Sequence, residues 1–275
     1  QAPLAFTAAS AETYGPLTFT VSADGRKIAW GRAAIDAEVD PPIYRNELTV
    51  ANIDGSEQVT LLAQVENNER RFVEPVRFSP DNATLFYALQ PDGLGGDLFS
   101  VSGRYDNLYA VSAGGGEPEL LLACPDEADL CIGDLSPDGN LLSYADPAAG
   151  LVYLIDRQGG LVASLTPPAT GYIGPALFGP NGNLALVAAT LAETGGEAEL
   201  PRPNPGTILL LKPPYTGQPE TLLSDNTVVT LWEWLDDNRL AYGSLAEDGG
   251  IGTSIVTLDG QTRQLSPNFA LAVWR

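Results

Sequence analysis

Acidic side chains are the candidate catalytic groups of this chain, because its 275 residues include no histidine. That absence excludes a Ser-His-Asp triad, a Cys-His pair, a histidine general base and a histidine-ligated metal. Two carboxylates can still hydrolyse a glycosidic bond, one as general acid and the other as nucleophile or base. Asp134 and Glu233 are the two whose places in the strand pattern described below would suit such chemistry.

The only two cysteines, Cys124 and Cys131, are close together in the segment Cys-Pro-Asp-Glu-Ala-Asp-Leu-Cys. In an exported protein they would form a disulfide that closes a short loop, worth about 2–3 kcal/mol by the chain-entropy estimate. The alternative is a pair of free thiols in a cytosolic protein. Two thiolates without a histidine partner fall short of a tetrahedral set, so no metal site and no cofactor are predicted.

The net charge of −21 reflects a shortage of bases, with 14 Lys+Arg against 35 Asp+Glu. A nucleic-acid partner is excluded, because binding to phosphates needs a basic stripe. Membrane insertion is not expected, since no apolar run approaches the roughly 18 residues of a spanning helix. The sequence has no methionine. We therefore expect a cleaved export signal before Gln1, and a protein located extracellularly, at the cell surface or in a periplasm.

Five repeated units organise the chain, each with an alternating strand, a polar turn and a second short apolar strand. The turns are centred on Asp24, Asp81, Asp138, Asn181 and Asp237. A hairpin then recurs in each unit, at Asp54-Gly55, Gly114-Gly115, Gly159-Gly160, Thr216-Gly217 and Asp259-Gly260. A fourth apolar strand closes each unit.

Five units of four antiparallel strands, without a long amphipathic helix, predict an all-β fold, a β-propeller with five full blades. The path from Asp237 through the chain ends to Asp24 is too short to hold two turn-to-turn intervals, so a sixth full blade does not fit. The propeller would cover residues 17–265. The remaining segments, 1–16 and 266–275, contain β-prone stretches that would close the ring as terminal strands or form a partial extra blade.

The Ser-Pro-Asp-Gly turn at 136–139, the following Leu-x-Tyr strand and the Asp-Gly or Gly-Gly hairpins resemble the WD-like propeller repeats of TolB. The same repeats are similar to those in propeller domains of dipeptidyl and prolyl peptidases. The resemblance covers roughly residues 17–265 and is weaker in the fourth and fifth units. In the peptidases the catalytic triad sits in a separate α/β-hydrolase domain, so the resemblance implies a fold and a binding role but no chemistry.

The longer predicted loops lie at one end of the blades and are rich in carboxylates. Binding residues concentrate on loops that are mounted on a rigid scaffold, so this acidic loop face is the candidate binding surface. The partner would be a protein, a glycan or a calcium ion, although no calcium-loop motif is present. The alternative is that the carboxylates only keep the loops exposed to water and bind no partner. The candidates are Asp36, Glu38, Asp40, Tyr44, Asp92, Asp97, Arg104, Tyr105, Asp106, Glu193, Glu197 and Arg202.

The innermost strands offer a second candidate site. Two apolar rows are expected to pack between blades: Val21, Phe78, Leu135, Phe178 and Trp234, and Phe19, Val76, Gly133, Ala176 and Trp232. The alternate row is Thr20, Arg77, Asp134, Leu177 and Glu233, which we expect to face a central channel. Arg77 and Asp134 would form a structural ion pair there.

Three functions remain open at this point. The favoured one is a non-catalytic binding or assembly module. The second is a structural subunit of an extracellular filament, joined by exchange of terminal strands between molecules. The third is the carboxylate-dependent glycoside-acting enzyme. In addition, Asn82-Ala-Thr84 is a glycosylation sequon on an exposed turn.

Overall fold

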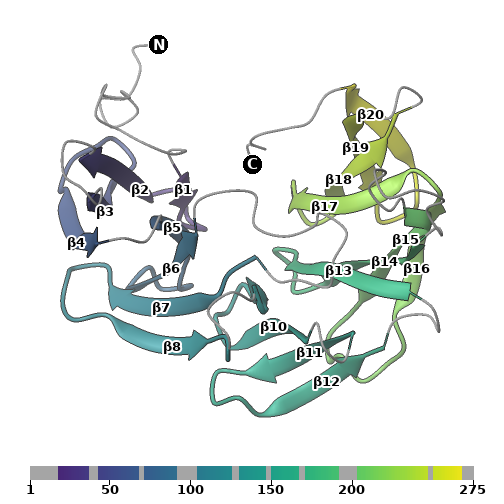
Figure 1. Ribbon diagram of the computed structural model, residues 1–275, viewed down its shortest axis with the longest axis horizontal. Helices are drawn as coiled ribbons and strands as arrows, with labels where there is room; N and C mark the ends of the chain where they lie inside the picture. Colours follow the sequence, from purple (N-terminus) through teal and green to yellow (C-terminus); the bar gives the residue numbers. More distant parts are fainter. Residues whose placement is uncertain are drawn as a thin grey trace. The chain divides into compact units, whose positions relative to one another are not determined.

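In the part of the chain that the structure describes, the strands form five separate four-stranded antiparallel sheets. The computed structural model describes residues 18–36, 43–67, 71–91, 104–125, 130–146, 150–166, 171–191, 203–246 and 250–267. All helix and strand elements in these ranges are β-strands (Figure 1). Strands that follow one another in the chain are neighbours within each sheet, so the predicted five units of four antiparallel strands are confirmed.

Two compact units contain these sheets. The first unit comprises Gln1–Gly95 and Tyr105–Asp129, and the second comprises Gly96–Arg104 and Leu130–Arg275. Sheet one has β1 (Thr18–Val21), β2 (Lys27–Asp36), β3 (Ile43–Asn52) and β4 (Val59–Asn67). Sheet two, also in the first unit, has β5 (Arg71–Phe78), β6 (Thr84–Pro91), β7 (Asn107–Ser112) and β8 (Glu119–Ala123).

The second unit contains three sheets. Sheet three has β9 (Ile132–Leu135), β10 (Leu141–Asp146), β11 (Leu151–Asp156) and β12 (Leu161–Leu165). Sheet four has β13 (Gly171–Phe178), β14 (Leu184–Leu191), β15 (Pro203–Leu211) and β16 (Glu220–Asp225). Sheet five has β17 (Val228–Trp234), β18 (Arg239–Leu245), β19 (Ile251–Thr257) and β20 (Thr262–Ser266).

A serine and an aspartate lock the first hairpin of sheets one to three. In sheet two the Ser79 hydroxyl donates to Asp81 at 2.6 Å, the Ala83 N–H donates to the same carboxylate at 3.1 Å, and the Thr84 N–H donates to the serine oxygen at 2.9 Å. These bonds to its charged form lower the pKa of Asp81. Ser22 with Asp24 and Ser136 with Asp138 make the same pattern.

Two of the predicted turns are displaced. In sheet five the carboxylate that accepts from the turn backbone belongs to Asp236, not to Asp237, because Leu235 replaces the serine that would anchor it. In sheet four the second hairpin turns at Lys212–Tyr215, where the Tyr215 N–H donates to the Lys212 carbonyl at 2.9 Å, and not at Thr216-Gly217. Two prolines, 213 and 214, occupy the middle of that turn.

The strands extend further than the polar composition of their ends suggested. Residues 35–36 and 43–45 are strand although we expected a loop there, since β2 and β3 pair as far as Asp36 with Ile43. Likewise β4 runs to Asn67 and β5 begins at Arg71, whereas the sequence suggested a connection between blades at 63–74. An antiparallel backbone ladder bonds the main chain whatever the side chains are, so polar residues did not end these strands.

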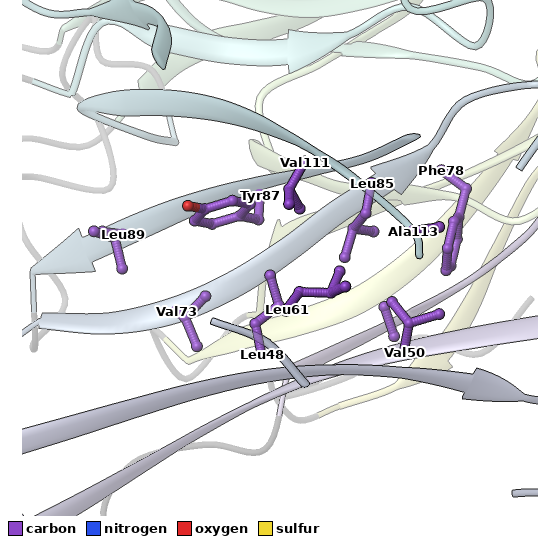
Figure 2. Packing of buried hydrophobic residues seen from close by; sticks show 11 residues of the cluster. Leu48, Val50, Leu61, Val73, Phe78, Leu85, Tyr87, Leu89, Val111 and Ala113 are labelled. Carbon is purple, nitrogen blue, oxygen red and sulfur yellow. The ribbon is translucent and has the colours of Figure 1, made fainter. Parts of the chain in front are cut away.

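Apolar residues from both sheets of the first unit form one of its cores. Figure 2 shows Leu48 and Val50 of sheet one packed with Val73, Phe78 and Leu85 of sheet two. By contrast, Phe19 and Val21 of β1 remain 36% and 40% exposed, although they were predicted to pack between blades. Thr18 of the same strand bonds to Val73 of sheet two, so these alternating residues face away from that sheet.

Candidate functional site

Asp134 is a link between two neighbouring sheets of the second unit. Its carboxylate is buried and accepts from the N–H of Leu135 at 2.7 Å and from the N–H of Phe178, in β13, at 2.8 Å. Beside it, the buried Ser143 hydroxyl donates to the Ala176 carbonyl of β13 at 3.1 Å and accepts from the Asp134 N–H at 2.8 Å. Both groups on the edge of β13 are thereby satisfied, as buried backbone groups must be.

This geometry corrects the predicted channel row. Leu177, which follows Asp134 in that row, is fully buried in a core with Trp234 and Leu240 of sheet five. Phe178, one residue later, belongs instead to the core shared with sheet three. Successive residues of an inner strand therefore point to the two faces of the sheet, and each face of sheet four packs against a neighbouring sheet.

For Arg77 and Glu233, the other two charged residues of the row, a place in a central channel stays a prediction. Arg77 in β5 and Glu233 in β17 are half-buried. The ion pair of Arg77 with Asp134 stays a prediction, because the two residues belong to different units. For Asp134 the bonds to Leu135 and Phe178 define a structural role, with one oxygen engaged by each N–H.

Asn46 makes the corresponding link in the first unit, and sequence reasoning missed it. Its side-chain oxygen accepts from the N–H of Val73 in β5 at 3.1 Å, while Thr18 donates to the Val73 carbonyl at 3.0 Å. Asn46 is buried within the alternating strand β3. The available signal was an asparagine at an inward-facing strand position, which is unusual unless its amide has a partner.

The acidic loop face lies mostly outside the described residues: Glu38, Asp40, Asp92, Asp97, Glu193, Glu197 and Arg202. Two others, Asp36 and Tyr44, are on strands and not in a loop. Arg104 is half-buried and its guanidinium donates to the Trp232 carbonyl at 3.5 Å. The predicted surface is therefore described in part only.

Tyr105 and Asp106 are both buried, at 4% exposure, and so do not lie on the solvent-facing surface where the prediction placed them. The Tyr105 hydroxyl donates to Glu74 at 3.2 Å, and the Asp106 carbonyl accepts from the Cys124 N–H at 2.7 Å. The Asn107 amide bonds both backbone groups of Leu89, at 2.9 and 3.1 Å, and also donates to the Asp106 carboxylate. These polar residues hold the start of β7 in sheet two.

The two cysteines are disulfide-bonded, and since they are the only ones, the bond joins Cys124 to Cys131 as predicted. The sequon residue Asn82 has a φ of 58° in its turn, and its side chain contributes to the lowered pKa of Asp24 in sheet one. Its Oδ1 atom is buried. Glycosylation at Asn82 stays a prediction, one that requires its side-chain amide to be accessible.

The described residues contain neither a group of side chains suited to a metal ion nor a helix suited to crossing a membrane. No three Cys, Asp or Glu side chains in those ranges come together as a group that could hold a metal ion. In the same ranges, no helix is long and apolar enough to cross a membrane.

No family model and no curated protein matches the sequence. Solved structures do match. The β-propeller domain of the Trilobed protease from Pyrococcus furiosus has a TM-score of 0.54 at 9% identity, covering 94% of this chain and 72% of that one. TolB from Acinetobacter baumannii has a TM-score of 0.51 at 15% identity, covering 90% and 53%. A putative TolB from Agrobacterium tumefaciens has 0.51 at 17%, covering 91% and 81%.

The fold is a β-propeller. The predicted similarity to TolB-type and peptidase propellers is confirmed at the level of the fold, since all these identities are low. The chain spans about half the length of the Acinetobacter baumannii TolB. Each sheet thus has two hairpins at one end, and in sheets two and four the connection at the other end is longer, at 92–106 and 192–202.

Proposed function

We propose that this propeller is an exported, non-catalytic binding or assembly module that contacts its partner through the long-connection end of its blades. The observation that carries the proposal is the difference between the two ends of sheets two and four. The hairpins between first and second strands, and between third and fourth strands, are short and bonded across their turns. The connections between second and third strands include 92–106 and 192–202.

The charge of these connections indicates the class of partner. Besides the buried Asp106, segments 37–42, 92–106, 192–202 and 247–249 carry nine carboxylate residues but only two arginines, Arg104 and Arg202. A surface of that composition favours a basic protein segment over an acidic one, because complementary potentials steer encounter and suppress like-charged partners. The disulfide between Cys124 and Cys131 supports an exported location, where such bonds persist.

The test is binding of the purified chain to a lysine- and arginine-rich peptide, measured by titration calorimetry at low and at high salt. We expect binding that weakens with salt and that weakens further in the double variant Glu193→Gln, Glu197→Gln. The matched control is Glu57→Gln, Glu119→Gln, which removes the same charge from the hairpin end and should bind as the unaltered chain does. Equal loss in both variants, or no binding at low salt, would contradict the proposal.

The same preparation tests the enzymatic alternative. Turnover of a polysaccharide by the chain, lost in Glu233→Gln with the fold intact, would replace the binding proposal by glycoside chemistry.

A further inference from the structure

The fourth strand of each sheet ends the sheet in the described part of the chain, and each of the five has the same irregularity. Where it pairs with the third strand, it contains one residue more than its partner. This inserted residue is always apolar: Leu61, Leu121, Val162, Leu222 and Leu265. Bulges of this kind twist an edge strand and make it a poorer template for another strand.

Four of these edge strands also contain charged residues, which disfavour pairing with a further strand. Glu66 lies in β4, Glu119 in β8, Glu220 and Asp225 in β16, and Arg263 in β20. Strand β12, with the sequence Leu-Val-Ala-Ser-Leu, contains neither a charged residue nor a proline. No charged residue occurs in the whole stretch from Gln158 to Ala192, in a chain of net charge −21.

The β12 edge also exposes apolar side chains. Leu161 is 64% exposed and Val162 is 42% exposed. In β4 and β16 the residue that corresponds to Leu161, immediately before the inserted one, is a threonine, Thr60 or Thr221, whereas in β8 it is Leu120, which is exposed but follows Glu119. The corresponding inserted residues Leu61 and Leu222 pack against hydrophobic cores. Strand β12 lies at the edge of its sheet (Figure 1).

We infer that β12 pairs antiparallel with β12 of a second copy of this chain, about a two-fold axis. A second copy of so acidic a chain is repelled at most of its surface, and three of the other four edge strands, β4, β8 and β16, contain carboxylate residues. The β12 edge is where that repulsion is absent and where apolar residues gain by burial. A strand pair of identical partners is self-complementary, as a two-fold interface requires.

The dimer is expected to be weak and strengthened by salt. An edge of five residues buries less than the roughly 1,200 Å² of a standard stable interface. Salt screens the long-range repulsion between two acidic copies but leaves the uncharged edge contact unaffected. This inference concerns a different surface from the proposed binding end, so either can fail without the other.

The test is analytical ultracentrifugation over a concentration series up to the millimolar range, at low and high salt. We expect a monomer–dimer equilibrium whose dissociation constant rises by about tenfold or more in Leu161→Lys, because each copy then loses an apolar side chain from the contact and brings a charge to it. The control is Thr221→Lys, which makes the same change of net charge at the corresponding position of β16 and should leave the equilibrium unchanged. Both positions are exposed, and circular dichroism checks that both variants fold.

Three results would overturn the inference: a monomer at every concentration, equal weakening in both variants, or assemblies beyond the dimer that are insensitive to Leu161→Lys. The last would point instead to exchange of terminal strands.

Discussion

Single polar side chains form hydrogen bonds with buried backbone groups of edge strands that would otherwise have no partner. Asp134 serves the edge of β13 and Asn46 serves the edge of β5. A carboxylate at an inner-strand position suggested catalysis when only the sequence was considered. Its hydrogen bonds to Leu135 and Phe178 explain the same residue by the need to satisfy buried N–H groups.

The turn aspartates make a pH-dependent contribution to stability. The pKa of Asp81 is lowered by hydrogen bonds from the Ser79 hydroxyl and the Ala83 N–H. Its folded pKa is therefore below its unfolded one, so its stabilisation is complete above the unfolded pKa and is lost as pH falls through the folded pKa. We expect Asp81→Asn to destabilise the chain at pH 7 and to have less effect as the pH falls below about 4, measured by urea unfolding.

The control for that series is Asp237→Asn, an exposed position in a turn that uses Asp236 instead. Its urea midpoints should parallel those of the unaltered chain from neutral to acid pH. If the effect of Asp81→Asn stayed constant over the whole range, the carboxylate of Asp81 would not be the titrating group.

At the scale of the strands, close approach between sheets depends on particular glycines. A Cβ atom at Gly31, in β2, would lie 2.1 Å from the Val73 carbonyl oxygen in β5, and one at Gly206 would lie 2.3 Å from the Val228 oxygen in β17. The first glycine belongs to a contact within the first unit and the second to a contact within the second unit. Absence of a side chain at these points sets how close a strand can come to the next sheet.

We therefore expect Gly31→Ala to lower the free energy of unfolding by about 1–3 kcal/mol, because the backbone oxygen of Val73 cannot move aside without shifting β5. The matched substitution is Gly217→Ala, where a Cβ would have open space around it. Chemical denaturation compares the two. An effect of Gly31→Ala no larger than that of Gly217→Ala would show that the two sheets separate easily at this point.

For the whole molecule, the disulfide is the covalent feature whose contribution can be measured directly. Replacing Cys124 and Cys131 together by serine should lower the free energy of unfolding by about 2–3 kcal/mol, through the entropy of the short loop that the bond closes in the unfolded chain. Thermal and urea unfolding of the variant measure this loss. Reduction of the unaltered chain should reproduce it, and a stability unaffected by both treatments would contradict the estimate.

The sequence by itself determined the all-β class, the five units and most of the hairpins. These features depend on local rules: Ser, Asp, Asn and Gly in fixed positions close tight turns such as that at Ser79 and Asp81, and alternation of apolar residues sets each strand. The disulfide could be predicted as well, from the short spacing of the only two cysteines. Where the local signal was weaker, the turn lies at other residues than the sequence predicts, as at Asp236 and at Lys212–Tyr215.

Only the tertiary structure decided which side chains and which sheets contact one another. Alternation shows that Leu177 and Phe178 point to opposite faces, but not that each face packs on another sheet, because that depends on residues far away in the chain. For the same reason the burial of Tyr105 and Asp106, the links made by Asn46 and Asp134, and the exposure of Leu161 at an uncharged edge are not readable from sequence. A side chain's surroundings are set by segments that folding brings beside it, and these determine whether a carboxylate binds a partner, catalyses or bonds a backbone.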